Sequence, residues 1–117
     1  MEKVTRMGQL YDCYGQLLTE RQRQMVELHY LDDWSLAEIA AQFGVSRQAV
    51  HDNLRRAEEQ LEAYESALAL VRASDLMRRV ADMWPRAAAG MAPADREQMA
   101  GWLRELAGIL RSPWEEG

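Results

Sequence analysis

The chain has 117 residues, a length that suits one small domain, with or without a helical extension, around a single hydrophobic core. Its 19 acidic residues outnumber 14 basic ones, so the net charge is −5, the opposite of the basic balance that nucleic-acid-binding domains usually carry. The single cysteine, Cys13, excludes an intrachain disulfide and a cysteine-based metal site, and favours a reducing compartment.

The composition predicts an all-α protein, because Ala, Leu, Glu, Gln, Met and Arg dominate and β-branched residues are few. No run approaches the roughly 18 apolar residues of a membrane span, and the first residues lack the apolar centre of a signal peptide. We therefore expect a cytoplasmic protein without membrane insertion. The basic set is one lysine and 13 arginines, a bias that weakens any arginine cluster as evidence for a binding site.

The first two helices are predicted by apolar spacing and by a capping box. A helix from about Lys3 to Leu17 would turn inward the apolar residues Val4, Met7, Tyr11, Tyr14 and Leu18. Thr19 and Gln22 match the two halves of a capping box, which starts a second helix. That helix is expected to end before Asp32 and to turn inward Met25, Val26 and Leu28.

The next two helices are predicted to meet at a glycine turn. Ser35 and Glu38 form a second capping box, and the short helix that follows ends at Gly44, where a left-handed residue is sterically cheap. Ser46 caps a long helix from Arg47. Apolar residues recur along this helix at alternating spacings of four and three. They must be buried against another helix, either of this chain or of a second copy; they are Val50, Leu54, Ala57, Leu61, Tyr64, Leu68 and Val71.

The C-terminal third is predicted to be a helical extension. After Val71 the apolar phase slips, which predicts a kink or a new helix start at Ser74–Asp75 before Leu76, Val80 and Met83 resume the spacing. Residues 85–93 are expected to be a linker, with Pro93 as the first residue of a last helix. That helix has an apolar stripe of Met99, Leu103, Leu106 and Leu110, widened by Trp102 and Ile109. We divide the chain into a helix-turn-helix domain, residues 1–71, and an extension, residues 72–117, for dimerisation or partner contact.

Residues 39–54 carry the pattern of a helix-turn-helix. Such a unit needs a small residue where its two helices touch, a turn residue tolerant of positive φ, and apolar residues at fixed offsets. Ala40 and Gly44 fill the first two positions, and the apolar set is Ile39, Phe43, Val45, Val50 and Leu54. We therefore predict a tri-helical fold with a helix-turn-helix.

The start of the second of these helices is the candidate DNA-reading surface. In a major groove its exposed residues would be Ser46, Arg47, Gln48, His51 and Arg55. Arg47 suits guanine or phosphate and Gln48 suits adenine, while backbone N–H groups at Ser46 suit a phosphate. Asp52 on the same face opposes DNA binding, and residues 35–62 hold three arginines against five acids. The alternative is a helix-turn-helix that serves only as a packing unit.

The segment Tyr11–Leu70, with LTERQ, HYLDD, SLAEIA and GVSRQAVHDN, resembles the YlxM family of small bacterial helix-turn-helix proteins. This segment is similar to the sigma-factor region that reads the −35 promoter element. The resemblance implies a sigma-region-4-like fold, winged-helix-superfamily-like without the wing, and contact positions at the five residues named above. It also implies a dimer that binds DNA and a link to the signal recognition particle pathway. His29 stands where the family often has tyrosine, and the Ala- and Arg-rich C-terminal third is a second departure.

A second basic surface is predicted on the C-terminal extension. Arg72, Arg79 and Arg86 are seven residues apart, and Arg78 adds to the stripe that they would form on a continuous helix. Such a stripe could meet the phosphates of signal recognition particle RNA or an acidic protein. The alternative is a solvated helix face that reflects the arginine bias.

No pattern points to an enzyme, a metal or a cofactor. Asp32 and Asp33 suit a turn before a helix, and His29 and His51 have no metal-ligand spacing. Of the four tryptophans, Trp114 is the one expected to be exposed; Trp34, Trp84 and Trp102 would complete the core or cover helix ends. Three functions stay open: a homodimeric DNA-binding regulator, a protein or RNA interaction module of the signal recognition particle pathway, and a structural dimer or anti-sigma-like partner.

Overall fold

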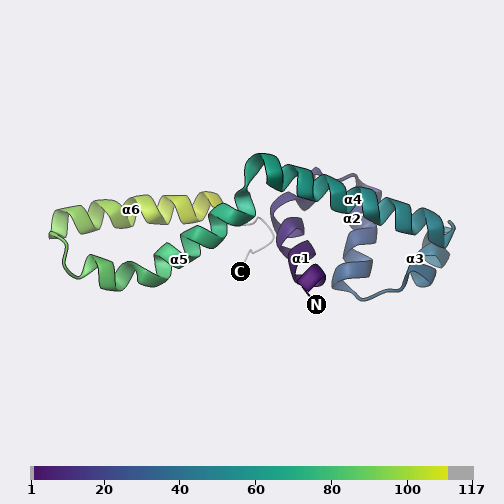
Figure 1. Cartoon of the computed structure of the whole chain (residues 1–117), viewed down its shortest axis with the longest axis horizontal. Coiled ribbons are helices and arrows are strands. Elements are labelled where there is room, and N and C mark those ends of the chain that lie inside the picture. Colours follow the sequence, from purple (N-terminus) through teal and green to yellow (C-terminus); the bar gives the residue numbers. More distant parts are fainter. Residues whose placement is uncertain (1, 111–117) are drawn as a thin grey trace. The chain divides into compact units, whose positions relative to one another are not determined.

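The computed structural model describes residues 2–110, so the expectation for Trp114 lies outside it. Every regular element in this range is helical (Figure 1), as the composition predicted. The helices are α1 (Glu2–Tyr14), α2 (Glu20–Val26), α3 (Leu36–Phe43), α4 (Arg47–Leu68), α5 (Leu70–Ala88) and α6 (Pro93–Leu110). They form two compact units, Met1–Leu68 and Ala69–Gly117, so the sequence-based division after Val71 lies inside α5. None of the described helices is long and apolar enough to cross a bilayer.

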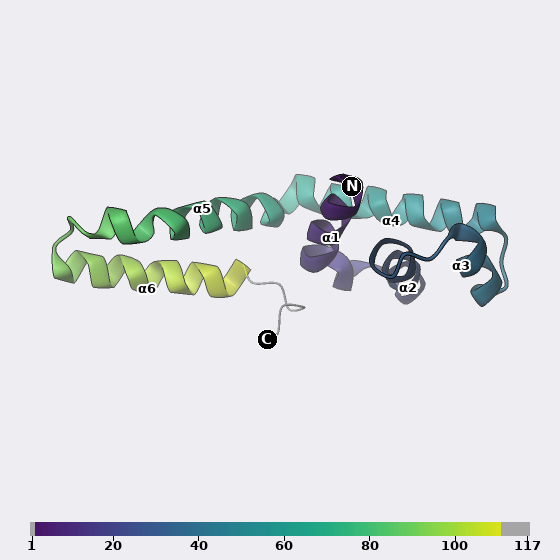
Figure 2. The same ribbon diagram turned by 90° about the horizontal axis from the view of Figure 1, so that it is seen from below.

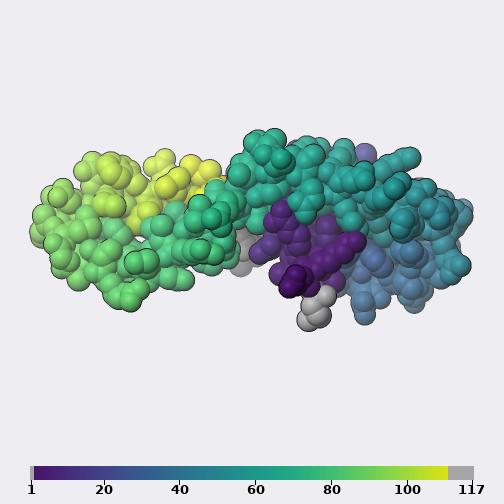
Figure 3. All heavy atoms as spheres, in the orientation of Figure 1, coloured from purple at the N-terminus to yellow at the C-terminus, as the bar shows by residue number. Residues whose placement is uncertain are grey.

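In the first unit, α1, α2 and α3 all pack against α4. In Figure 3 the atoms of α1 lie directly on those of α4. The seam predicted on the long helix is buried here from Val50 to Leu61, against helices of the same chain. The largest fully buried side chains of the unit are Tyr14, Leu10, Met25, Ile39, Leu61, Val26 and Val50. As far as Leu61, the apolar residues of this seam are therefore buried without a second copy of the chain. Leu68, further along α4, is exposed.

The first helix follows its predicted pattern except at its two ends. Val4 is 49% exposed, so its predicted inward position is wrong. At this end α1 meets α4 through the polar side chains of Lys3 and Arg6, and the apolar contact begins one turn later, at Met7. Beyond Tyr14 the chain tightens into a 3-10 turn, Gly15–Leu17, rather than continuing as α-helix.

Both predicted capping boxes are confirmed. The hydroxyl of Thr19 accepts from the N–H of Gln22 at 3.1 Å, and the Gln22 side chain accepts from the N–H of Thr19 at 3.0 Å. Ser35 and Glu38 make the same reciprocal pair. After α2 the helix widens into a π-helical segment, Glu27–Leu31, which local spacing did not predict.

The second unit is an antiparallel hairpin of α5 and α6 (Figure 2), connected by residues 89–92. A new helix start at Ser74–Asp75 is wrong, because α5 runs through both residues and the helix is interrupted instead at Ala69, with φ 54°. Asp75 fits the helix because its carboxylate lies one turn from three arginines. The predicted linker at residues 85–93 is also too long, since Pro85 lies inside α5. Pro93 begins α6, as predicted.

Candidate nucleic-acid interface

The turn between α3 and α4 is fixed by backbone geometry. Gly44 has φ 66°, and a Cβ built there would meet no heavy atom within 4 Å, so conformation rather than space requires glycine. The N–H of Val45 donates to the carbonyl of Ala40 at 3.0 Å. The Ser46 hydroxyl oxygen caps α4 by accepting from the N–H of Ala49 at 3.0 Å. The first turn of α4 is therefore held in place, and the Ser46 hydroxyl hydrogen stays available to donate.

The predicted contact residues are all exposed; Ser46 directly precedes α4, and Arg47, Gln48, His51 and Arg55 lie on its first three turns. Residues four apart lie one above the other on a helix, so Arg47, His51 and Arg55 form one row. Neither Arg47 nor Arg55 makes an ion pair within residues 2–110. This row can therefore present two unpaired guanidinium groups and one imidazole to a ligand.

A second row, Gln48 and Asp52, lies beside the first. Gln48 Nε2 donates to Asp52 Oδ1 at 3.0 Å. The Nδ1 atom of His51 lies 3.7 Å from the same oxygen. The Asp52 carboxylate, which opposes DNA binding by its charge, thus accepts a hydrogen bond from Gln48 and has His51 as a neighbour.

The acidic balance of residues 35–62 is less unfavourable in the structure than in the sequence. Glu58 accepts from the Tyr30 hydroxyl and lies 3.3 Å from the Lys3 ammonium. Glu62 accepts two hydrogen bonds from Arg6, at 3.0 and 3.2 Å, and this contact raises the pKa of the guanidinium. Because these two carboxylates have cationic neighbours on α1, they contribute little net field at the start of α4.

Arg21 was missed by the sequence analysis. This exposed α2 side chain places its guanidinium 5.1 Å from the ring centre of Phe43, the last residue of α3. It is therefore a further restrained cation close to the turn that leads into α4. No spacing rule links the two residues, because the contact forms only once α2 and α3 have packed.

The four predicted arginines of the second basic surface lie on α5. Three of them surround one carboxylate: Asp75 lies 3.9 Å from Arg72, 3.9 Å from Arg78 and 3.3 Å from Arg79. Arg86 lies in the last turn of the helix. The three side chains around Asp75 are more than 60% exposed, so their charge is available to a ligand but partly neutralised.

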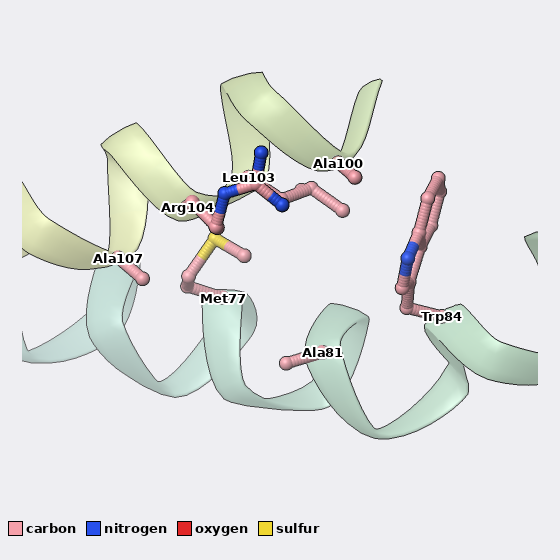
Figure 4. A pocket seen from close by; sticks show the side chains of 7 residues that line it. All are labelled: Met77, Ala81, Trp84, Ala100, Leu103, Arg104 and Ala107. Atoms are coloured by element: carbon pink, nitrogen blue, oxygen red, sulfur yellow. The ribbon is translucent and has the colours of Figure 1, made fainter. Parts of the chain in front are cut away.

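The α5–α6 hairpin holds a shallow apolar hollow of about 260 Å³. Figure 4 shows its lining, in which Arg104 is the one charged side chain; the other members are Met77, Ala81, Trp84, Ala100, Leu103 and Ala107. Trp84 is half-buried here, whereas Trp102 is 57% exposed, so the expected covering role of Trp102 is wrong. Trp34 is half-buried.

The other acidic and histidine residues singled out in the sequence have local roles. His29 Nδ1 lies 2.8 Å from the carbonyl oxygen of Trp34, across the loop before α3. Asp32 and Asp33 are exposed in that loop, and Asp33 has φ 64°. Among the described residues no group of three or more His, Cys, Asp or Glu side chains is placed to hold a metal ion.

Comparison with known proteins identifies the family. Residues 1–89 match the model of the UPF0122 family, "helix-turn-helix protein, YlxM / p13 like". The chain belongs to this family. It is 47% identical over 106 residues to a UPF0122 protein of Geobacillus kaustophilus, covering 91% of this chain and 96% of the relative. A Streptococcus gordonii member is 46% identical over 90 residues, covering 74% and 82%, and a Bacillus thuringiensis member is 56% identical over 71 residues, covering 61% and 64%.

Membership of UPF0122 confirms the YlxM resemblance and the helix-turn-helix. It also extends the similarity beyond Leu70, where the resemblance in the sequence ended. A match over 106 of the 117 residues includes most of the α5–α6 unit. The sequence of the hairpin is therefore similar to that of at least one other UPF0122 protein.

Proposed function

We propose that this UPF0122 protein is a DNA-binding regulatory protein of the cytoplasm that places the start of α4 in the major groove. The observation that carries the proposal is the row of Arg47, His51 and Arg55 beside Gln48, exposed on a helix whose opposite face is buried. A recognition helix presents its N-terminal residues to bases and phosphates in this way. The helix-turn-helix family supports the same assignment.

Each contact residue has a distinct part in this proposal. Arg47 pairs with guanine or a phosphate, and Gln48 with adenine. The backbone N–H groups after Ser46 and the guanidinium of Arg21 hold phosphates on either side of the groove. With so few cations the salt dependence is shallow, since each neutralised phosphate contributes a slope of about −0.9, and one copy binds weakly.

We further propose that the protein is a homodimer, which would compensate for weak binding by one copy. Both helices of the second unit expose apolar residues at spacings of three and four: Leu76, Val80 and Met83 on α5, and Met99, Trp102, Leu106 and Ile109 on α6. Within the described part of this unit, Ala88 is the one buried residue, at 5% exposure. Such helices need a further apolar surface, and a second hairpin supplies one with matching stripes.

A second candidate function is a protein or RNA interaction module of the signal recognition particle pathway. The acidic balance of residues 35–62 favours it, because it disfavours DNA. The arginines of α5 would then contact RNA phosphates, with Arg72, Arg78, Arg79 and Arg86 as the surface and the helix-turn-helix as scaffold.

The two candidates are separated by titrating fluorescent random-sequence duplex DNA at low salt, with signal recognition particle RNA as competitor. DNA reading predicts that Arg47→Ala removes most duplex binding and that Arg79→Ala, an equal change of charge on α5, does not. Because Arg47 is exposed, the Arg47→Ala variant should have the same melting temperature as the wild type. Binding of the RNA alone, sensitive to Arg79→Ala, would replace the first candidate with the second.

A further inference from the structure

The hydrogen bond between Gln48 and Asp52 leaves a defined set of free groups on the surface of α4. It uses one of the two N–H donors of the Gln48 amide and the Oδ1 atom of Asp52. Oδ2 of Asp52 makes no hydrogen bond to any residue from 2 to 110. The pair therefore offers one amide N–H and one amide oxygen at Gln48, and only acceptor capacity at Asp52.

These free groups match one class of base edge. In the major groove adenine and cytosine present an exocyclic amine, at N6 and N4, whereas guanine presents O6 and thymine O4 as acceptors. A carboxylate accepts a hydrogen bond from either amine. Opposite a keto oxygen it loses water and gains no bond, which disfavours binding.

The structure assigns to Gln48 and Asp52 a joint role as a selector of amino bases over keto bases at two adjacent positions of the target strand. Gln48 reads adenine, with its oxygen accepting from N6 and its free N–H donating to N7, and Asp52 accepts from the amine of the adenine or cytosine beside it. The inference rests on the proposed placement of α4 in the major groove.

The Gln48–Asp52 hydrogen bond and the negative charge of Asp52 contribute to base selection by different amounts. A hydrogen bond between exposed side chains four residues apart biases the Gln48 rotamer by only about twofold. The larger effect comes from the Asp52 charge, which is repelled by phosphates and by keto oxygens alike. Asp52 therefore lowers affinity for all DNA and raises discrimination between bases, while Arg47 and Arg55 in the next row supply attraction.

The test is a selection from a random duplex library with the full chain, followed by binding titrations on the selected site and on keto-substituted versions. The wild type should prefer an amino base at the position beside adenine by about tenfold. Asp52→Asn should lose most of that preference, because the amide can donate to keto oxygens, and should bind random duplex more tightly. Gln48→Ala should lose the adenine preference at its own position only.

Glu59→Gln is the matched control, because Glu59 lies on the same face seven residues further along α4, is exposed, and carries the same charge. It should raise affinity for random duplex slightly and keep the base preference. If Asp52→Asn and the wild type select the same bases, the selector role is wrong and DNA binding stands. If the wild type binds no duplex at low salt, both the selector role and the proposed function fail.

Discussion

The carboxylate of Glu38 shows how one residue couples helix capping to pH. It accepts a hydrogen bond from the backbone N–H of Ser35 at 2.8 Å, while the Ser35 hydroxyl oxygen accepts from the N–H of Glu38 at 3.1 Å. The backbone N–H of Ser35, and to a smaller extent its hydroxyl, favour the ionised carboxylate and lower the pKa of Glu38 below its ordinary value. The ionised form is therefore favoured in the folded chain more than in the unfolded chain.

The sign of the resulting pH dependence follows from linkage. A carboxyl with a lowered pKa stabilises the fold above its unfolded-state pKa, and that contribution is lost as the pH falls through the folded-state value. In Glu38→Gln the side-chain oxygen can still accept the hydrogen bond from the Ser35 N–H, but the group no longer ionises. In urea denaturation, the wild type should lose free energy of unfolding relative to Glu38→Gln on going from pH 6 to pH 3, with no such loss between pH 6 and pH 8. A constant difference over the whole range would contradict the assignment.

Replacing the cap itself should cost stability at any pH. Ser35→Ala removes the acceptor for the Glu38 N–H at the start of α3, and a lost N-cap costs about 1 kcal/mol. Thr19→Ala, which removes the corresponding cap of α2, is the parallel case. Urea denaturation at pH 7 measures both, and a free energy of unfolding unchanged in both variants would show that neither cap stabilises the fold.

At the scale of elements, the turn between α3 and α4 depends on one left-handed residue. Gly44→Ala places a Cβ in open space but keeps φ at 66°, so we expect a loss of about 1 kcal/mol from backbone strain alone. Gly8→Ala is the opposite case, because Gly8 lies inside α1 with nothing within 4 Å of its Cβ position. It should stabilise the fold by about 0.5–1 kcal/mol. Chemical denaturation measures the free energy of unfolding of both variants. A change of the same sign and size in both would contradict a special conformational requirement at Gly44.

The elements that the sequence predicted well are those with local signals. Capping residues marked the starts of α2, α3 and α4, and Gly44 marked the end of α3, because each acts on backbone groups within one turn. Ala69 gave no such signal, since alanine is the best helix former, yet it has the left-handed conformation that separates α4 from α5. A phase slip at Ser74 was visible in the sequence, but a slip in apolar spacing does not by itself interrupt a helix.

In the candidate interface, too, the features with local sequence signals could be predicted and those that depend on helix packing could not. The positions of its five residues at the start of α4 could be predicted, because they follow from helical spacing after a recognised turn. The Gln48–Asp52 hydrogen bond is also local, at four residues, although the sequence analysis treated Asp52 only as repulsive. Arg21 could not be found in this way, since its contact with Phe43 depends on how α2 and α3 pack.

At the scale of the whole molecule, the exposed stripes of α5 and α6 predict the oligomeric state. Ile109 is 71% exposed, and a glutamate there would place an unpaired charge in the proposed dimer contact. Ile109→Glu should therefore sediment as a monomer at concentrations where the wild type is a dimer. The helical content of the first unit should be retained, as judged by circular dichroism.

Gln60→Glu is the control, because Gln60 is an exposed polar residue of α4, outside the hairpin, and receives the same charge. It should leave the dimer intact. Leu61→Glu would not test the dimer, because Leu61 is fully buried within the first unit and the variant should unfold. A monomeric wild type, or a dimer unaffected by Ile109→Glu, would exclude this interface.

The polar contacts between α1 and α4 have a consequence for the uniqueness of the fold. Lys3 lies beside Glu58, Arg6 binds Glu62, and the Tyr14 hydroxyl donates to Glu65. Apolar side chains alone tolerate a slide of one helix along another by a turn, about 5.4 Å, because one ridge resembles the next. Because Glu58, Glu62 and Glu65 are about one turn apart on α4, such a slide would bring some side chains of α1 to a new carboxylate, but it would remove the α1 partner of Glu58 or of Glu65, depending on its direction. The glutamates of α4 thus favour one position of α1 along the helix, although each exposed pair adds little to stability.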